Sequence, residues 1–163
     1  CSMNLWAPWR MGYILAPRDE GCLFCDKSKE NQDEKNLLVA RGEHCFVLLN
    51  LYPYSNGHVM IAPYRHLPRL QELNEEECRE MMSLAQRMVE ALSQAVNAEA
   101  FNLGINQGRA AGAGIEEHLH LHLVPRWEGD TNFMPALGAA KVIPQCLEET
   151  YRLLRQALQA SPP

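Results

Sequence analysis

The sequence predicts an α+β fold with a mostly antiparallel sheet, one long helix and a C-terminal helix. Short apolar runs bounded by turn residues, which are typical of strands, lie within 36–63 and again within 100–124. Two other segments repeat apolar residues every three or four positions, as helices with one buried face do. The resulting order is three strands, a helix, two strands and a second helix, and this order favours an α+β architecture.

The composition bounds the class of protein. The 163 residues are 47% hydrophobic and 21% charged, which predicts a single globular domain over 1–163. The net charge of -5 argues against a nucleic acid as the main partner, since such proteins usually carry a basic face. No apolar run approaches the ~20 residues of a membrane span, so no membrane partner is expected. The N-terminal residues lack the pattern of a secretion signal, so we expect a cytoplasmic protein with reduced thiols.

The first half of the chain predicts an arm and three strands. Residues 1–21 hold two of the three tryptophans and predict an irregular, apolar N-terminal arm. Two strands are expected within 36–50, around a turn at Gly42. Turn-forming residues at 53–57 precede a third strand at 58–63, which ends on a proline.

Two segments have the helical period. The long helix is expected to begin after Asn74, which forms the pattern of a capping box with Glu77. Its apolar stripe consists of Met81, Leu84, Ala85, Met88, Leu92 and Ala95. The C-terminal helix, 144–159, opens with a proline at the first helical position. Its apolar residues are Leu147, Tyr151, Leu154 and Leu158.

Three histidines stand at alternate positions in the last predicted strand. Strands are expected over 100–106 and 118–124, joined by a loop rich in glycine and alanine. His118, His120 and His122 alternate with leucines, so the imidazoles share one face of the strand. An exposed face is more simply filled by Thr, Lys or Glu, so the row indicates function. It indicates either a metal site or nucleophilic or acid-base catalysis, because imidazole suits neutral pH.

Cys22 and Cys25 form a Cys-x-x-Cys motif. The motif alone is compatible with a zinc site, a redox pair or two ordinary cysteines. A redox pair should lie between a strand and a helix, whereas this motif follows the irregular arm, which disfavours that interpretation. A structural zinc ion needs four ligands. Since the chain has no second such motif, the other two ligands must come from distant positions.

The histidine row and its surroundings resemble a known family. His118-Leu-His-Leu-His-Leu-Val, followed by Pro-Arg, resembles the signature of the histidine-triad (HIT) family of nucleotide hydrolases and transferases. Residues 49–66 are similar to the family's upstream strand-turn-strand, and 106–108 to its phosphate-side loop. The resemblance covers nearly the whole chain and implies a HIT-like fold. Three further segments look like the branch that includes diadenosine tetraphosphate phosphorylases: LWAPWR, PRWEGDTNFMP and KVIPQCLEETYRLLR.

The resemblance implies a role for each of several residues. His120 would be the nucleophile that attacks the α-phosphate of a nucleotide, and His122 would donate a proton to the phosphate or the leaving group. The nucleotide- and phosphate-binding residues would be Asn50, Asn106, Gln107, Gly112 and Gly114. A role for Asn50 in capping the end of its strand is the competing interpretation. The chain departs from the family pattern at Gly114, where many members have a phosphate-binding glutamine.

The resemblance also implies a structural zinc ion and a homodimer. Zinc-bearing members of the family add two histidines to the Cys-x-x-Cys motif. The ligands would therefore be Cys22, Cys25, His66 and His118. By contrast, His58 follows Gly57 and is interpreted as a turn residue.

The predicted function is nucleotidyl transfer through a nucleotidyl-histidine intermediate. It would cleave dinucleoside polyphosphates, such as diadenosine tetraphosphate, by phosphorolysis. The alternatives are a hydrolase of the same compounds, a nucleoside phosphoramidase of the same fold, and, from another class, a zinc-stapled nucleotide-binding module without turnover. A phosphate acceptor needs a cationic or N–H-rich pocket, for which Arg109 and Arg126 are the nearest candidates in sequence, although Glu116 and Glu117 stand close by.

Overall fold

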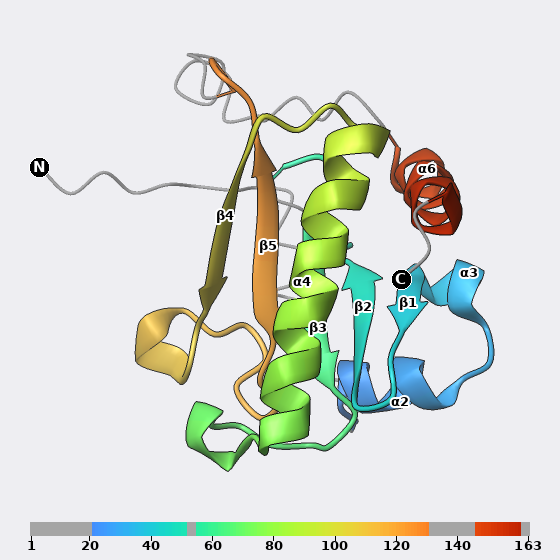
Figure 1. Ribbon diagram of the computed structural model, residues 1–163. Coiled ribbons are helices and arrows are strands. Elements are labelled where there is room, and N and C mark those ends of the chain that lie inside the picture. Colours follow the sequence, from blue (N-terminus) through green and yellow to red (C-terminus); the bar gives the residue numbers. More distant parts are fainter. Residues whose placement is uncertain (1–20, 52–54, 131–145, 161–163) are drawn as a thin grey trace, which may run out of the picture.

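The chain forms a five-stranded antiparallel sheet with helices on both faces (Figure 1). The computed structural model describes residues 21–51, 55–130 and 146–160. The strand order is β1-β2-β3-β5-β4, and every neighbouring pair is antiparallel. The elements are α2 Leu23–Lys29, α3 Asp33–Asn36, β1 Leu38–Arg41, β2 Cys45–Leu49, β3 Val59–Pro63, η2 Leu70–Glu72, α4 Glu75–Ala95, β4 Ala100–Ile105, η3 Arg109–Ala111, β5 Leu121–Arg126 and α6 Leu147–Ala160. The α+β prediction is confirmed.

The long helix α4 covers one face of the sheet, as Figure 1 shows. The capping box predicted for its start is present, because the Asn74 side chain accepts from the Glu77 N–H and the Glu77 carboxylate accepts from the Asn74 N–H. The predicted apolar stripe faces the sheet and packs in the larger core with α6. Helix α6 is described from Leu147, so the predicted start at Pro144 lies outside the described residues, as does the arm before Gly21.

A smaller core lies on the opposite face of the sheet, under helix α2. It consists of Phe24, Leu38, Phe46, Leu48, Met60 and Ala62. The sequence did not predict α2. Since Met60 pairs with His122 in the sheet, His122 lies on this second face, whereas Leu121 and Leu123 belong to the larger core. The predicted separation of histidines and leucines onto two faces is therefore confirmed for β5.

The last strand begins later than predicted. The ladder starts at Leu121, and Leu119 pairs with the loop after β3, since its N–H donates to the Leu67 carbonyl oxygen at 2.7 Å. This detour places His118 beside that loop and leaves His120 at the start of the sheet. Strand β4 forms one edge of the sheet and, among the described residues, pairs with β5 alone. Within residues 21–51, 55–130 and 146–160, no helix combines the length and the apolar character needed to cross a membrane.

Candidate active site and metal centre

Four predicted metal ligands meet in one cluster. Cys22 is the N-cap of α2 and Cys25 lies in its first turn, while His66 follows β3 and His118 precedes β5. Their ligand atoms all lie within 4.8 Å of one another. Three segments that are distant in the sequence thus supply two thiols and two imidazoles to one point.

The spacing of these atoms fits a tetrahedral ion. The Cys22 Sγ lies 3.3 Å from the His118 Nδ1, and the Cys25 Sγ lies 3.4 Å from the His66 Nδ1 and 3.6 Å from the His118 Nδ1. Zinc bonds of about 2.3 Å to sulfur and 2.0–2.1 Å to nitrogen give sulfur–nitrogen edges of roughly 3.5 Å in a tetrahedron. Burial raises the pKa of the Cys22 thiol to about 11, so a thiolate at this position requires a cation beside it.

A hydrogen bond on the side of the ring away from the cysteines orients His118. Its Nε2 lies 2.8 Å from the Pro63 carbonyl oxygen, which can only accept, so Nε2 carries the proton and Nδ1 presents its lone pair to the cysteines. The imidazole is fully buried, and burial lowers its pKa, so the ring is neutral near neutral pH. A neutral, oriented imidazole is the form that binds a metal.

His120 is held as a neutral imidazole with one nitrogen available. Its Nδ1 donates to the His118 carbonyl oxygen at 2.9 Å, which leaves Nε2 as the unprotonated nitrogen. The side chain is 4% exposed, and burial lowers its pKa. The Phe24 ring packs against it with the centroids 4.8 Å apart. An unprotonated ring nitrogen in a fixed orientation is the state that a histidine nucleophile needs.

His122 is in contact with a histidine that the sequence did not assign to the site. The His58 Nε2 lies 2.9 Å from the His122 Nδ1, and His58 is fully buried. The interpretation of His58 as a turn residue is therefore incomplete. Because Met60 pairs with His122, His58 is the diagonal cross-strand neighbour of His122 on the same face. Only the register of β3 against β5 reveals this contact, and no signal in the sequence fixes that register.

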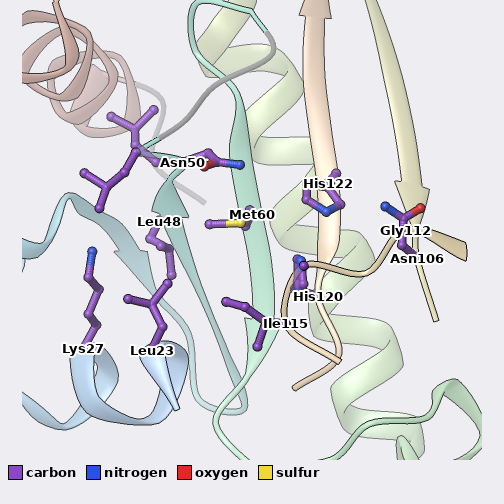
Figure 2. A pocket seen from close by; sticks show the side chains of 13 residues that line it. Leu23, Lys27, Leu48, Asn50, Met60, Asn106, Gly112, Ile115, His120 and His122 are labelled. Atoms are coloured by element: carbon purple, nitrogen blue, oxygen red, sulfur yellow. The ribbon is translucent and has the colours of Figure 1, made fainter. Parts of the chain in front are cut away.

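A pocket opens beside the two histidines (Figure 2). His120, His122 and Asn106 line one end, and Figure 2 shows Leu23 and Lys27 of α2 at the other. The full lining comprises Leu23, Lys27, Leu48, Leu49, Asn50, Leu51, Met60, Asn106, Gly112, Gly114, Ile115, His120 and His122. The pocket is thus polar at the histidines and largely apolar towards α2.

Most of the predicted nucleotide-binding residues gather around this pocket. Asn50, Asn106, Gly112 and Gly114 line it together with the two catalytic candidates. Gln107 does not belong to the lining, and its Oε1 accepts from the Leu70 N–H at 2.8 Å. Gly112 ends η3 with a φ of 87°, a left-handed conformation that favours glycine.

The two arginines expected near a phosphate acceptor are bound elsewhere. The Arg109 guanidinium pairs with Glu116 at 2.8 Å, and Arg126 pairs with Asp130 at 2.7 Å. Neither arginine lines the pocket. The pocket residues that can bind phosphate are instead amide and imidazole groups and the loop backbone. Lys27 is the lysine in the lining, and no motif in the sequence singles it out.

Comparisons to known proteins identify the family of this chain. A family model described as the HIT domain matches residues 31–129. A Mycobacterium tuberculosis protein named AP-4-A phosphorylase is 42% identical over 159 residues, which is 93% of this chain and 82% of that protein. A Dictyostelium discoideum protein named bis(5'-adenosyl)-triphosphatase is 35% identical over 88 residues, 54% of this chain and 58% of that protein. The chain therefore belongs to the histidine-triad family, and it is an enzyme of that family.

A solved structure shares the fold. It is described as a Zn-bound histidine triad family protein from Mycobacterium smegmatis, with a TM-score of 0.68 and 28% sequence identity. The match covers 86% of this chain and 94% of that one. The cysteine and histidine cluster thus occurs in a chain whose fold is shared with a zinc-bound relative.

Proposed function

We propose that the protein cleaves dinucleoside polyphosphates, such as diadenosine tetraphosphate, by nucleotidyl transfer to His120 and then to phosphate. The observation that carries the proposal is the state of His120: it is buried and neutral, its Nδ1 is fixed on the His118 carbonyl, and the ring lines the pocket. Its Nε2 attacks the α-phosphorus, the bond from phosphorus to the bridging oxygen breaks, and ATP leaves. A phosphate oxygen then displaces the imidazole and ADP forms.

His122 is proposed as the proton donor to the leaving phosphate. It lies two residues from His120 on the same face, and the ring centroids are 4.7 Å apart. The contact with His58 fixes the orientation of the ring. Asn50 is proposed to bind the ribose hydroxyls. Asn106 and the backbone around Gly112 and Gly114 are proposed to hold the phosphate oxygens, since N–H groups in such loops bind anions without net positive charge.

A structural zinc ion is proposed for the cysteine and histidine cluster. Cys22, Cys25, His66 and His118 would hold it with no open position, so the ion would tie α2 to the sheet and take no part in the chemistry. The distances between sulfur and nitrogen atoms and the Zn-bound relative support this assignment.

A homodimer is also proposed. In the part of the chain that the structure describes, β4 is an edge strand and its Leu103 side chain is 46% exposed, so this edge offers backbone groups and apolar surface to a second copy. Sedimentation equilibrium should give twice the chain mass for the wild type. A Leu103→Glu variant should shift the equilibrium towards the chain mass, and a monomeric wild type would contradict the proposal.

The acceptor is tested by product analysis. Diadenosine tetraphosphate is incubated with and without millimolar phosphate, and the nucleotides are separated. ADP and ATP that appear only with phosphate support phosphorolysis, whereas AMP and ATP at a rate indifferent to phosphate identify a hydrolase. The relative named as a triphosphatase makes hydrolysis the second candidate. Cleavage confined to a nucleoside phosphoramidate would instead identify a phosphoramidase.

The nucleophile is tested separately. His120→Gly should abolish turnover and the acid-labile nucleotidyl-protein, while AMP still binds through the rest of the pocket. His44→Ala is the matched control, because His44 lies before β2 and does not line the pocket. Near-normal turnover by His120→Gly would refute the assignment, and nucleotide binding without turnover in the wild type would indicate a binding module.

A further inference from the structure

Lys27 is the lysine of the pocket lining, and the proposed chemistry does not use it. It lies on α2, is half-buried, and contributes to the pocket lining. Figure 2 shows its side chain beside Leu23, with its nitrogen at the end of the pocket away from His120 and His122. A cation at the largely apolar end of a pocket calls for an explanation, because apolar side chains are the usual lining there.

The Lys27 ammonium has N–H donors that the described residues leave available for a ligand. Among the residues that the structure describes, it forms no hydrogen bond or ion pair with a side chain or carbonyl. Burial lowers the pKa of the Lys27 ammonium, and Glu30, at the end of α2, acts in the opposite direction. One carboxylate oxygen of Glu30 accepts from the Asn36 side chain at 2.7 Å. An ammonium has three N–H donors. A ligand in the pocket can therefore supply acceptors that this part of the protein does not.

The proposed placement of a nucleotide in the pocket decides which part of it would reach Lys27. This step rests on the proposed function, in which the α-phosphate lies against His120. The ribose would then lie near Asn50, and the base would enter the apolar end between Leu23 and Leu48. On this placement the edge of the base that carries N7 and position 6 would face the Lys27 ammonium, so the hydrogen-bonding pattern of that edge matters.

Purine bases differ at this edge. Guanine presents two acceptors, O6 and N7, and lysine binds both atoms in known recognition of guanine. Adenine presents N7 as an acceptor but a donor amino group in place of O6. An ammonium opposite that amino group would place two donors against each other. We propose that Lys27 is a specificity-determining residue that makes the pocket select a 6-oxopurine, such as guanine, over adenine.

A substrate with two different ends tests this proposal by internal competition. In adenosine-guanosine tetraphosphate, guanine in the pocket yields GDP and ATP with phosphate as acceptor, and adenine in the pocket yields ADP and GTP. With water as acceptor, the same choice is read from GMP against AMP. The product ratio does not depend on the amount of active enzyme, so it is insensitive to the stability of a variant.

The wild type should favour the guanine-side products by roughly 5-fold or more, since a good base contact is worth about 1–3 kcal/mol. Lys27→Met keeps the length of the side chain and should bring the ratio near unity, while Lys27→Arg should keep a preference for guanine. Lys29→Met is the matched control, because Lys29 is an exposed lysine of the same helix outside the lining, and its ratio should equal that of the wild type. A wild-type ratio at or below unity, or a ratio that Lys27→Met leaves unchanged, overturns the proposal.

Binding separates this inference from the proposed function. GMP, IMP and AMP are titrated into the His120→Gly variant, with and without Lys27→Met. GMP and IMP should both bind more tightly than AMP, and Lys27→Met should remove the difference. IMP is informative because it shares O6 with GMP and lacks the 2-amino group. If no dinucleoside polyphosphate is cleaved, the proposed function fails while this binding comparison still decides the role of Lys27. Equal binding of all three would overturn the inference even if cleavage occurs.

Discussion

Replacing His58 should impair the reaction through His122 without touching the substrate. His58 is fully buried, and its Nε2 lies 2.9 Å from the His122 Nδ1. In a His58→Leu variant the half-buried His122 ring loses this partner, and one hydrogen bond is worth about 0.5–1.5 kcal/mol. If the contact orients His122 in the transition state, kcat should fall by roughly 2- to 13-fold. KM should change little, because His58 does not line the pocket.

The assay is steady-state cleavage of a dinucleoside polyphosphate, combined with a double-mutant cycle. The loss caused by His58→Leu should disappear when His122 is already alanine, since a positioning residue has nothing left to position. His58→Gln should recover part of kcat, because its amide can again meet the ring nitrogen. Equal losses in both backgrounds would show that His58 supports only the fold, and an unchanged kcat would refute the reasoning.

Three further predictions concern stability. Removal of the metal by a strong chelator should lower the denaturation midpoint, because zinc-finger peptides gain roughly 10–16 kcal/mol of apparent binding free energy from zinc. Elemental analysis should find one zinc per chain. An unchanged midpoint in metal-free protein would contradict a structural role. Met88→Ala, at a fully buried position of α4, should lower the free energy of unfolding by about 2–5 kcal/mol in urea titration. Met82→Ala, at a 56% exposed position, should change it by less than about 0.5 kcal/mol. Equal effects would contradict the assignment of Met88 to the larger core. Asn74→Ala removes the side-chain acceptor for the Glu77 N–H and should cost about 1 kcal/mol in the same titration; no loss would mean that the cap is redundant.

The sequence predicted those elements whose signals are local. Helix α4 carries its own cap, Asn74 with Glu77, and a stripe that needs only helical spacing to be recognised. Helix α2 has neither, since it has seven residues and no side chain caps its start at Cys22. Such a short segment is marginal alone and depends on tertiary packing. Phe24, which contacts the rings of His118 and His120 from the second core, supplies that packing.

The candidate site was predicted where residue type alone indicates chemistry. Thiols and imidazoles are metal ligands wherever the chain brings them together, so the motif at Cys22 and Cys25 and the histidine row pointed to a site before any geometry was known. His58 and Lys27 carry no such signal, since each acquires its position from the pairing of distant strands or from the packing of α2. Arg109 shows the opposite error, because closeness in sequence to the histidine row did not bring it to the pocket.

Helix α2 connects the cysteine and histidine cluster to the pocket. Five consecutive residues of one short helix include the proposed ligand Cys25, the Phe24 ring that packs on His118 and His120, and the pocket residues Leu23 and Lys27. A helix of this length has little stability of its own, so what fixes Cys25 also fixes the wall against which a base would lie. A metal that does not contact the substrate would thereby influence how strongly the pocket discriminates between bases. Loss of metal should therefore weaken the discrimination between GMP and AMP before it exposes the larger core under α4.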